Sequence, residues 1–210
     1  MIKIQGNLPK FLFIAVSGGV DSMAVLDFVR RKHDVCALFF DHGTPASKQA
    51  LDFLLRYLPT INVPLYTGGV FTDKHKDQSW EEYWRDQRYT FFKIYSGFRK
   101  GEINTPVITA HHLDDCIETW VMTSLHGEGR IIPYQHANVI RPFRLTKKSD
   151  FIKWANDHEV PYVNDESNND IHFTRNRVRH VLMPHILDVN PGIAKVIAKK
   201  VKKDFEDLTF

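Results

Sequence analysis

Residues 11–22, with the sequence FLFIAVSGGVDS, decide the fold of this chain. Residues 11–16 form a continuous apolar run, which is typical of a strand that is buried on both faces of a parallel sheet. Gly18 and Gly19 follow it, and apolar residues then recur at helical spacing from Asp21 to Arg31. A glycine-rich turn between a buried strand and a helix exposes backbone N–H groups at the positive end of the helix dipole, so we predict a phosphate-binding loop.

The next part of the chain alternates strand-like and helix-like segments. Apolar runs predict strands at 35–40, 63–66 and 106–109, and amphipathic segments predict helices at 47–58, 79–98 and from residue 112 onward. Alternation of this kind favours a doubly wound α/β domain with a mostly parallel sheet, whose ligand site lies at the carboxyl ends of the strands. A last edge strand is expected at 139–143.

The pattern changes after residue 130. Helices are predicted at 148–158, 175–187 and 193–205, separated by polar turns at 164–170 and 190–192. We therefore expect two parts, a phosphate-binding domain over residues 1–145 and a small helical C-terminal extension over residues 146–210 that packs on it. Trp80, Trp84 and Tyr89 recur at roughly helical spacing and are predicted to be core residues rather than stacking platforms.

The composition is that of an ordinary globular protein. The chain has 210 residues, of which 43% are hydrophobic and 25% charged, and this fits one sizeable domain with a small appendage. Its formal charge is +3, and lysines gather near the C-terminus, which suits an anionic partner. Cys36 and Cys116 are isolated, so no disulfide scaffold or cysteine-bound metal site is supported, and a reducing cytoplasm is expected. The N-terminal apolar run is too short to span a membrane.

The glycine-rich loop lacks the Gly-Lys-Ser/Thr ending of a Walker loop, which disfavours ordinary transfer of the γ-phosphoryl group. Residues 17–22 instead resemble the PP-loop of the N-type ATP pyrophosphatases, which have an adenine nucleotide alpha hydrolase-like fold. The resemblance implies that an adenylated intermediate and pyrophosphate form. It assigns the ATP phosphates to Ser17, Gly18, Gly19, Asp21 and Ser22. The alternative is a simple glycine turn in which Asp21 or Ser22 caps the helix.

A second polar cluster lies at residues 111–119, with the sequence HHLDDCIET. On a helix, His111, Asp114, Asp115 and Glu118 would follow at positions i, i+3, i+4 and i+7 and share one face. Carboxylates crowded together need a compensating charge, which Mg²⁺ bridging ATP phosphates or an ammonium substrate would supply. Zinc is the weaker idea, because adjacent histidines diverge on a helix. A solvated polar helix start is the remaining alternative.

Further segments resemble the tRNA(Ile)-lysidine synthetases and follow that family's order from about residue 12 to residue 191. They are His42-Gly43, Glu81 with Arg85, Arg88 and Tyr89, residues 111–119, Arg141-Pro142, residues 165–168, and Arg175-Asn176 with Arg179. In that family, ATP adenylates the wobble cytidine of an isoleucine tRNA at its C2 oxygen, and the side-chain amine of lysine then displaces AMP to give lysidine. The resemblance thus implies a tRNA-modifying ligase that uses ATP and Mg²⁺, with tRNA and lysine as partners.

The resemblance also implies roles for the carboxylates. Asp114 and Asp115 are expected to hold Mg²⁺. Together with Glu118 and His111 they form the predicted catalytic set. One of the carboxylates would attract the lysine ammonium or accept its proton, because an ammonium must lose a proton before it can attack.

The remaining residues are assigned to the nucleotide and the RNA. His42 and Gly43 are expected to line the adenosine, and the alternative is a turn that carries a surface histidine. Two pairs of arginines are expected to bind phosphates or tRNA, namely Arg85 with Arg88 and Arg175 with Arg179. The alternatives are an exposed helix salt bridge for the first pair and ion pairs with Asp165 or Asp170 for the second.

Members of that family carry one or two further C-terminal domains that help to hold the tRNA, whereas this sequence ends at Phe210. We therefore expect that the tRNA is held by a homodimer, by a separate tRNA-holding partner, or by a stripe of lysines on one helix. The stripe consists of Lys195, Lys199 and Lys202. Thiolation is disfavoured, because the cysteine pairs of the related 2-thiocytidine synthetases are absent. Two alternatives stay open: adenylation of another tRNA base or a small metabolite, and a nucleotide-binding module without chemistry.

Overall fold

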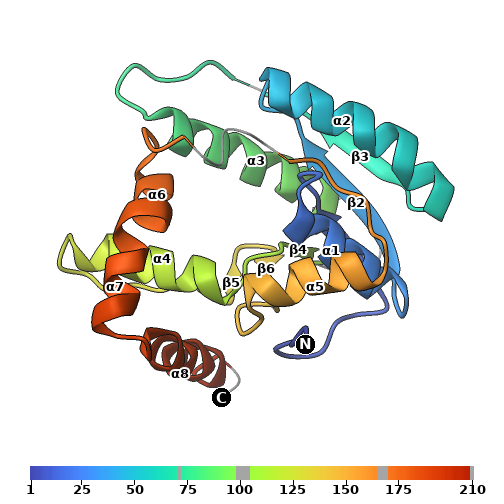
Figure 1. Ribbon diagram of the computed structural model, residues 1–210. Helices are drawn as coiled ribbons and strands as arrows, with labels where there is room; N and C mark the ends of the chain where they lie inside the picture. The colour runs from blue at the N-terminus through green and yellow to red at the C-terminus, as the bar shows by residue number, and fades with distance from the viewer. Residues whose placement is uncertain (71, 98–104, 165–169, 209–210) are drawn as a thin grey trace.

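A six-stranded sheet forms the centre of the molecule. The computed structural model describes residues 1–70, 72–97, 105–164 and 170–208 (Figure 1). In sheet order the strands are β3 (Leu65–Gly68), β2 (Asp34–Phe40), β1 (Phe11–Ala15), β4 (Val107–Ile108), β6 (Val139–Ile140) and β5 (Gln135–His136). All neighbours are parallel except β5, which runs antiparallel to β6. The expected α/β fold with a mostly parallel sheet is confirmed.

Both faces of the central strand β1 are buried, as its uninterrupted apolar sequence predicts. Leu12 and Ile14 belong to one apolar cluster, which includes residues of α1 (Val20–Arg30), α2 (Pro45–Tyr57) and α5 (Lys148–Asp157). Phe13 points to the other face and packs in a cluster with Phe91 and Phe92 of α3 (Trp80–Gly97). Side chains of a strand alternate between its faces, so β1 needs apolar residues throughout.

A third apolar cluster holds the C-terminal helices to the sheet domain. It joins α4 (Leu113–Ser124) to α8 (Ile193–Glu206) through Cys116, Ile117, Ile197 and Val201. Between them run α6 (Thr174–Arg177), a π-helical turn η3 (Val178–Leu182) and α7 (Met183–Val189). Figure 1 shows α6 and α7 as one column beside α4, with α8 beneath it. The proposed division at residue 145 stays a prediction.

Several predicted elements differ from the structure in detail. The segment expected as a last edge strand at 139–143 shortens to β6 and lies inside the sheet, while the unpredicted β5 forms that edge. The expected helix at 175–187 is interrupted by the π-helical turn. A short 3₁₀ helix, η1 (Leu58–Ile61), follows α2 and moves the next strand to Leu65–Gly68. Trp80 is 57% exposed, so its prediction as a core residue is wrong. Among the described residues, no helix has the length and apolar character needed to cross a membrane.

Candidate active site

The glycine-rich loop leaves the start of α1 open to a ligand. Gly19 is the N-cap residue, and no side chain caps the helix. Ser22 turns inward instead: its Oγ accepts a hydrogen bond from the N–H of Ser17 at 3.1 Å and donates one to the carbonyl of Gly19 at 3.0 Å. The alternative in which Asp21 or Ser22 caps the helix is therefore wrong. The first N–H groups of a helix have no partner within the helix, so they remain suited to an anion.

The two glycines of this loop are required for different physical reasons. Gly18 has a φ of +81°, and a Cβ added there would lie 3.0 Å from the Val163 side chain. The carbonyl of Gly18 also accepts a hydrogen bond from the N–H of Val163 at 2.9 Å, so this residue is fixed by the fold. Gly19 has an ordinary φ of −75°, and its added Cβ would meet only the Ser17 hydroxyl, at 3.5 Å. The backbone at Gly19 is therefore open to a ligand, and a phosphate there stays a prediction.

His42 is half-buried rather than fully exposed on the surface. Its ring packs between Phe40, at a centroid distance of 5.0 Å, and Trp84, at 5.5 Å. Burial and, to a smaller extent, the charge of Arg88 lower the pKa of His42 to about 4, so the imidazole is neutral. Its Nδ1 is buried and has no hydrogen-bond partner among the described residues. The alternative of a surface histidine is therefore wrong, and an adenosine contact stays a proposal.

His111 does not share a helical face with the carboxylates, because α4 begins only at Leu113. Its Nδ1 lies 2.7 Å from the hydroxyl of Thr109, and burial lowers the pKa of His111 to about 3, although Asp115 opposes this. His112 is the N-cap: its Nδ1 accepts the N–H of Asp115, whose carboxylate accepts the N–H of His112. This reciprocal pair is a capping box, and it fixes the first turn of α4.

His112 also connects α4 with the phosphate loop. Its Nε2 lies 3.6 Å from Oδ2 of Asp21, and the ammonium of Lys148 lies 3.7 Å from the same oxygen. Burial alone would lower the pKa of His112, but the carboxylates of Asp21 and Asp115 raise it. The other oxygen of Asp21, Oδ1, is buried and unpartnered within the described part of the chain. A cation bound to phosphates in this loop would give that oxygen a partner.

The neighbouring carboxylates of α4 face different partners. Asp114 accepts the N–H of Lys148 at 2.8 Å and lies toward the start of α5. Asp115 lies toward His112 and the arginines of α6 and η3. Over the described residues, no group of three His, Cys, Asp or Glu side chains is placed to hold a metal ion. Mg²⁺ shared by Asp114 and Asp115 therefore stays a prediction.

Two arginines neutralise Glu118. Arg175 Nε lies 3.1 Å from Oε2 of Glu118, and Arg179 Nε lies 2.6 Å from Oε1. Both guanidinium groups also lie 3.5 Å from Oδ1 of Asp115. Burial alone would raise the pKa of Asp115, but the charges of His112 and Arg175 lower it to about 2. Arg175 and Arg179 thus supply the compensating positive charge that we expected from Mg²⁺ or a substrate ammonium.

The alternative partners of these arginines differ in the structure. Asp170 accepts hydrogen bonds from the N–H and ring of His172, at 2.9 and 2.8 Å, and makes no ion pair with either arginine. Asp165 lies outside the described residues, as do the other matched residues 166–168. For Glu81 the structure describes the backbone position in α3 only. Within the described chain, ion pairs with Glu118 and Asp115 replace the expected contacts with Asp170.

Arg88 lies among other arginines and makes no ion pair with a carboxylate of the described residues. Burial lowers the pKa of Arg88, and three neighbouring guanidinium groups lower it further. They belong to Arg85, Arg141 and Arg175. Among the described residues Arg88 makes no ion pair, so its alternative as an exposed helix salt bridge is wrong. Arg141 is 3% exposed and bonds to the Tyr89 hydroxyl and, at 2.9 Å, to the Pro133 carbonyl. Sequence reasoning gave Arg141 and His112 no role.

Comparison with known proteins identifies the family. The family described as the PP-loop domain matches residues 4–186. This chain is a member of the PP-loop family. The PP-loop is the segment 17–22, where the strand, the uncapped helix and the open space beside Gly19 meet.

Curated relatives of this PP-loop chain include several proteins named tRNA(Ile)-lysidine synthase. The protein from Thermotoga sp. (strain RQ2) is 32% identical over an alignment of 203 residues that covers 90% of this chain and 48% of the relative. The protein from Lactiplantibacillus plantarum is 30% identical over 199 residues, covering 88% of this chain and 44% of the relative. The chain therefore spans about half the length of these curated relatives.

Solved structures share the PP-loop fold at low sequence identity. A U34-tRNA thiolase from Methanococcus maripaludis, solved with its [4Fe-4S] cluster, matches with a TM-score of 0.74 and 12% identity, over 95% of this chain and 74% of that chain. An NH3-dependent NAD synthetase from Campylobacter jejuni matches with a TM-score of 0.55 and 15% identity, over 95% and 87% of the two chains. These likenesses concern the fold alone.

Proposed function

We propose that this PP-loop chain adenylates the wobble cytidine of an isoleucine tRNA with ATP and joins lysine to it, which releases AMP and pyrophosphate. The observation that carries the proposal is a site that combines an uncapped phosphate loop, a buried carboxylate pair and a cluster of arginines around Arg88. A polyanionic substrate matches the arginines, and an amine matches the carboxylates. The similarity to proteins named tRNA(Ile)-lysidine synthase supports the same reaction.

The phosphate loop and its neighbours would bind ATP. The N–H groups at the start of α1 bind phosphate oxygens, and Ser17 and Ser22 hold the shape of the loop. His42 and Gly43 line the adenosine. When bound, Mg²⁺ neutralises phosphate charge, and Asp21, with its unpartnered Oδ1, is a candidate ligand beside the predicted Asp114 and Asp115.

The carboxylates of α4 would handle the amine. Lysine reaches the site as an ammonium, and Glu118 and Asp115 attract it. Glu118 is the proposed acceptor of the proton that the ammonium must lose, because the low pKa of Asp115 makes that carboxylate a weak base. Arg175 and Arg179 hold Glu118 in place in the absence of ligand. Arg175 acts electrostatically on Arg88, and Asp21 of the PP-loop acts electrostatically on Arg179. These two arginines could therefore neutralise a bound phosphate together with Arg88. His111, neutral because of its lowered pKa, would donate or accept a hydrogen bond rather than carry charge.

The products test the reaction class. ATP turnover in the presence of substrate tRNA and lysine is expected to give AMP and pyrophosphate in equal amounts, because the loop lacks the Walker lysine. Nucleosides from the treated tRNA are then analysed by mass spectrometry for lysidine. ADP and free phosphate as stoichiometric products would contradict the proposal. Turnover that needs no tRNA would instead favour an enzyme that adenylates a small metabolite.

The exposed lysines of α8 are expected to contact tRNA phosphates. Lys195, Lys199 and Lys202 are exposed, while Ile197 and Val201 are buried against α4. Val196, on the same helix, is 46% exposed. Replacing the three lysines with alanine should reduce the slope of log affinity against log salt by about two to three units, because each phosphate contact releases a counterion.

Binding of tRNA across a salt series measures this slope. A matched control replaces three exposed lysines on other elements, Lys32, Lys48 and Lys93. It removes the same charge and should leave the slope unchanged. ATP affinity should be unaffected in both variants. If the plots of log affinity against log salt have the same slope for the parent and the α8 variant, the three lysines lie outside the tRNA interface. That result would favour a homodimer or a separate tRNA-holding partner.

A further inference from the structure

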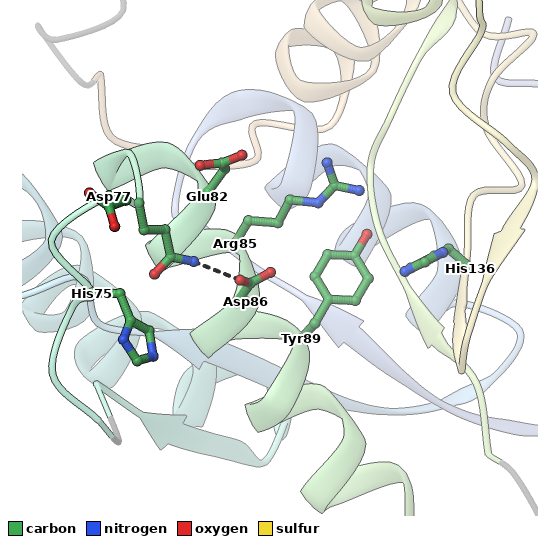
Figure 2. Close-up of a pocket in the computed structure, with 8 residues that line it drawn as sticks. His75, Asp77, Glu82, Arg85, Asp86, Tyr89 and His136 are labelled. Carbon is green, nitrogen blue, oxygen red and sulfur yellow. Dashed lines mark hydrogen bonds between the residues drawn. The ribbon is translucent and has the colours of Figure 1, made fainter.

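A pocket lies beside the candidate active site, and the chemistry described above does not use it. It has a volume of about 600 Å³ and opens between α3, the segment before it and β5 (Figure 2). Volumes of about 300–1,000 Å³ are usual for pockets that bind small molecules. Glu82, Arg85, Asp86 and Tyr89 line it from one face of α3, because they recur at i, i+3, i+4 and i+7.

One side of this pocket is aromatic and cationic. The rings of Tyr89 and His136 meet edge to face, with centroids 5.4 Å apart, and the guanidinium of Arg85 lies 5.8 Å from the centre of the Tyr89 ring. Figure 2 shows the His136 ring directed from β5 toward Tyr89. Tyrosine, histidine and arginine planes are the surfaces on which proteins stack unpaired RNA bases.

The other side of the pocket offers hydrogen-bond acceptors. Asp77, Glu82 and Asp86 contribute carboxylates. Asp86 holds the Gln78 amide through Oδ2 at 2.8 Å, and its Oδ1 has no hydrogen-bond partner among the described residues. These carboxylates would repel a phosphate but would accept hydrogen bonds from the ring N–H or exocyclic amino group of a base. The charges therefore favour a base, rather than a phosphate, as the occupant.

Tyr89 and Arg85 link the lining of the pocket to residues of the active site. The Tyr89 hydroxyl bonds to Arg141, whose charge acts on both Arg88 and His111. Arg85 lines the pocket and also acts electrostatically on Arg88 and Arg141. A backbone phosphate held by Arg85 and Arg88 would thus connect one nucleotide in the active site to the next one in the pocket.

We propose that this pocket receives the base of a nucleotide that flanks the modified base in the substrate tRNA. The inference rests on the proposed function and deepens it, because it assigns a second base-binding position. The flanking base stacks beside Tyr89 and His136, and Asp86 accepts a hydrogen bond from its edge. Tyr89, predicted from the sequence to be a core residue, is only half-buried and forms part of this wall.

Binding measurements with an anticodon stem-loop RNA test the pocket. In the parent, removing the base on one side of the target cytidine should weaken binding about tenfold. His136→Ala and Asp86→Ala should each weaken binding of the intact RNA by a similar factor and should lose the sensitivity to the missing base, since coupled partners give non-additive effects. Matched controls at exposed positions elsewhere, His126→Ala and Asp52→Ala, should behave like the parent.

The outcomes separate this inference from the proposed function, because the binding assay needs no turnover. If the parent forms lysidine but the His136 and Asp86 variants keep full sensitivity to the missing base, the pocket assignment alone is overturned. If these variants change the affinity for free lysine and not for RNA, the pocket binds the amino acid and the assignment is likewise overturned. Base-sensitive binding without lysidine formation would support the pocket and overturn the proposed reaction.

Discussion

Replacing Gly19 with valine is expected to abolish ATP binding, with a loss of affinity of about a hundredfold or more, while the protein keeps its fold. The φ of Gly19, −75°, is acceptable to valine, and an added Cβ would meet no protein atom closer than 3.5 Å. The valine side chain would instead fill the space beside the uncapped start of α1, where a phosphate must approach the backbone.

Calorimetric titration with ATP and thermal unfolding measure the two halves of this prediction. Gly192→Val is the matched control, because Gly192 is also a helix N-cap, with a φ of −87°, and its added Cβ would approach only the side chain of Asn190. That variant should bind ATP normally. Gly18→Ala should behave differently from both, since the φ of +81° and the contact with Val163 predict a loss of stability. If Gly19→Val binds ATP with nearly the affinity of the parent, the prediction that an ATP phosphate lies beside Gly19 is wrong.

Asp115→Asn and Glu118→Gln should each slow turnover by about a hundredfold or more, because the amine would lose a carboxylate that attracts it and, in Glu118→Gln, the proposed acceptor of its proton. The structure adds an expectation about stability. Glu118 is 4% exposed and faces two guanidinium groups, so its glutamine variant should also unfold at a lower temperature than the asparagine variant at Asp115.

Single-turnover formation of AMP, measured beside thermal unfolding, separates the two roles of these carboxylates. Glu128→Gln is a suitable control, because Glu128 pairs with Arg130 on the surface, where ion pairs contribute little. It should retain the rate and the unfolding temperature of the parent. A large loss of stability in Glu118→Gln with nearly normal turnover would show that Glu118 serves only to hold α6 and η3 against α4.

The phosphate loop and its fold could be predicted from sequence because their determinants are local. The buried strand, the two glycines and the following helix lie within residues 11–30, and each leaves a pattern of its own. The start of α4 was predicted to within one residue, but His111 was wrongly placed on its helical face because histidine is an uncommon N-cap. Asp115 at the N3 position is a capping-box signal that could have identified His112 as the cap. The edge strand β5 is a pair of exposed polar residues, so it carries no apolar periodicity.

The ion pairs of the site could not be predicted, because they join distant parts of the chain. Arg175 and Arg179 are separated from Glu118 by 57 and 61 residues, and no local pattern connects them. Sequence reasoning recognised that the carboxylates need compensating charge and looked for it in a ligand. Likewise, the cluster of arginine charges around Arg88 becomes visible only when α3 packs against the strand that precedes Arg141.

The hydrogen bond between Gly18 and Val163 has a consequence for synthesis of the protein on the ribosome. The PP-loop is made of residues 17–22, yet the carbonyl of Gly18 is held by Val163, which is synthesised much later. The Val163 side chain also fills the space beside Gly18. Contacts so distant in sequence form only after the intervening chain is available. A nascent chain therefore carries an unfinished nucleotide loop until residue 163 has left the ribosome, and ATP can stabilise the domain only from that point onward.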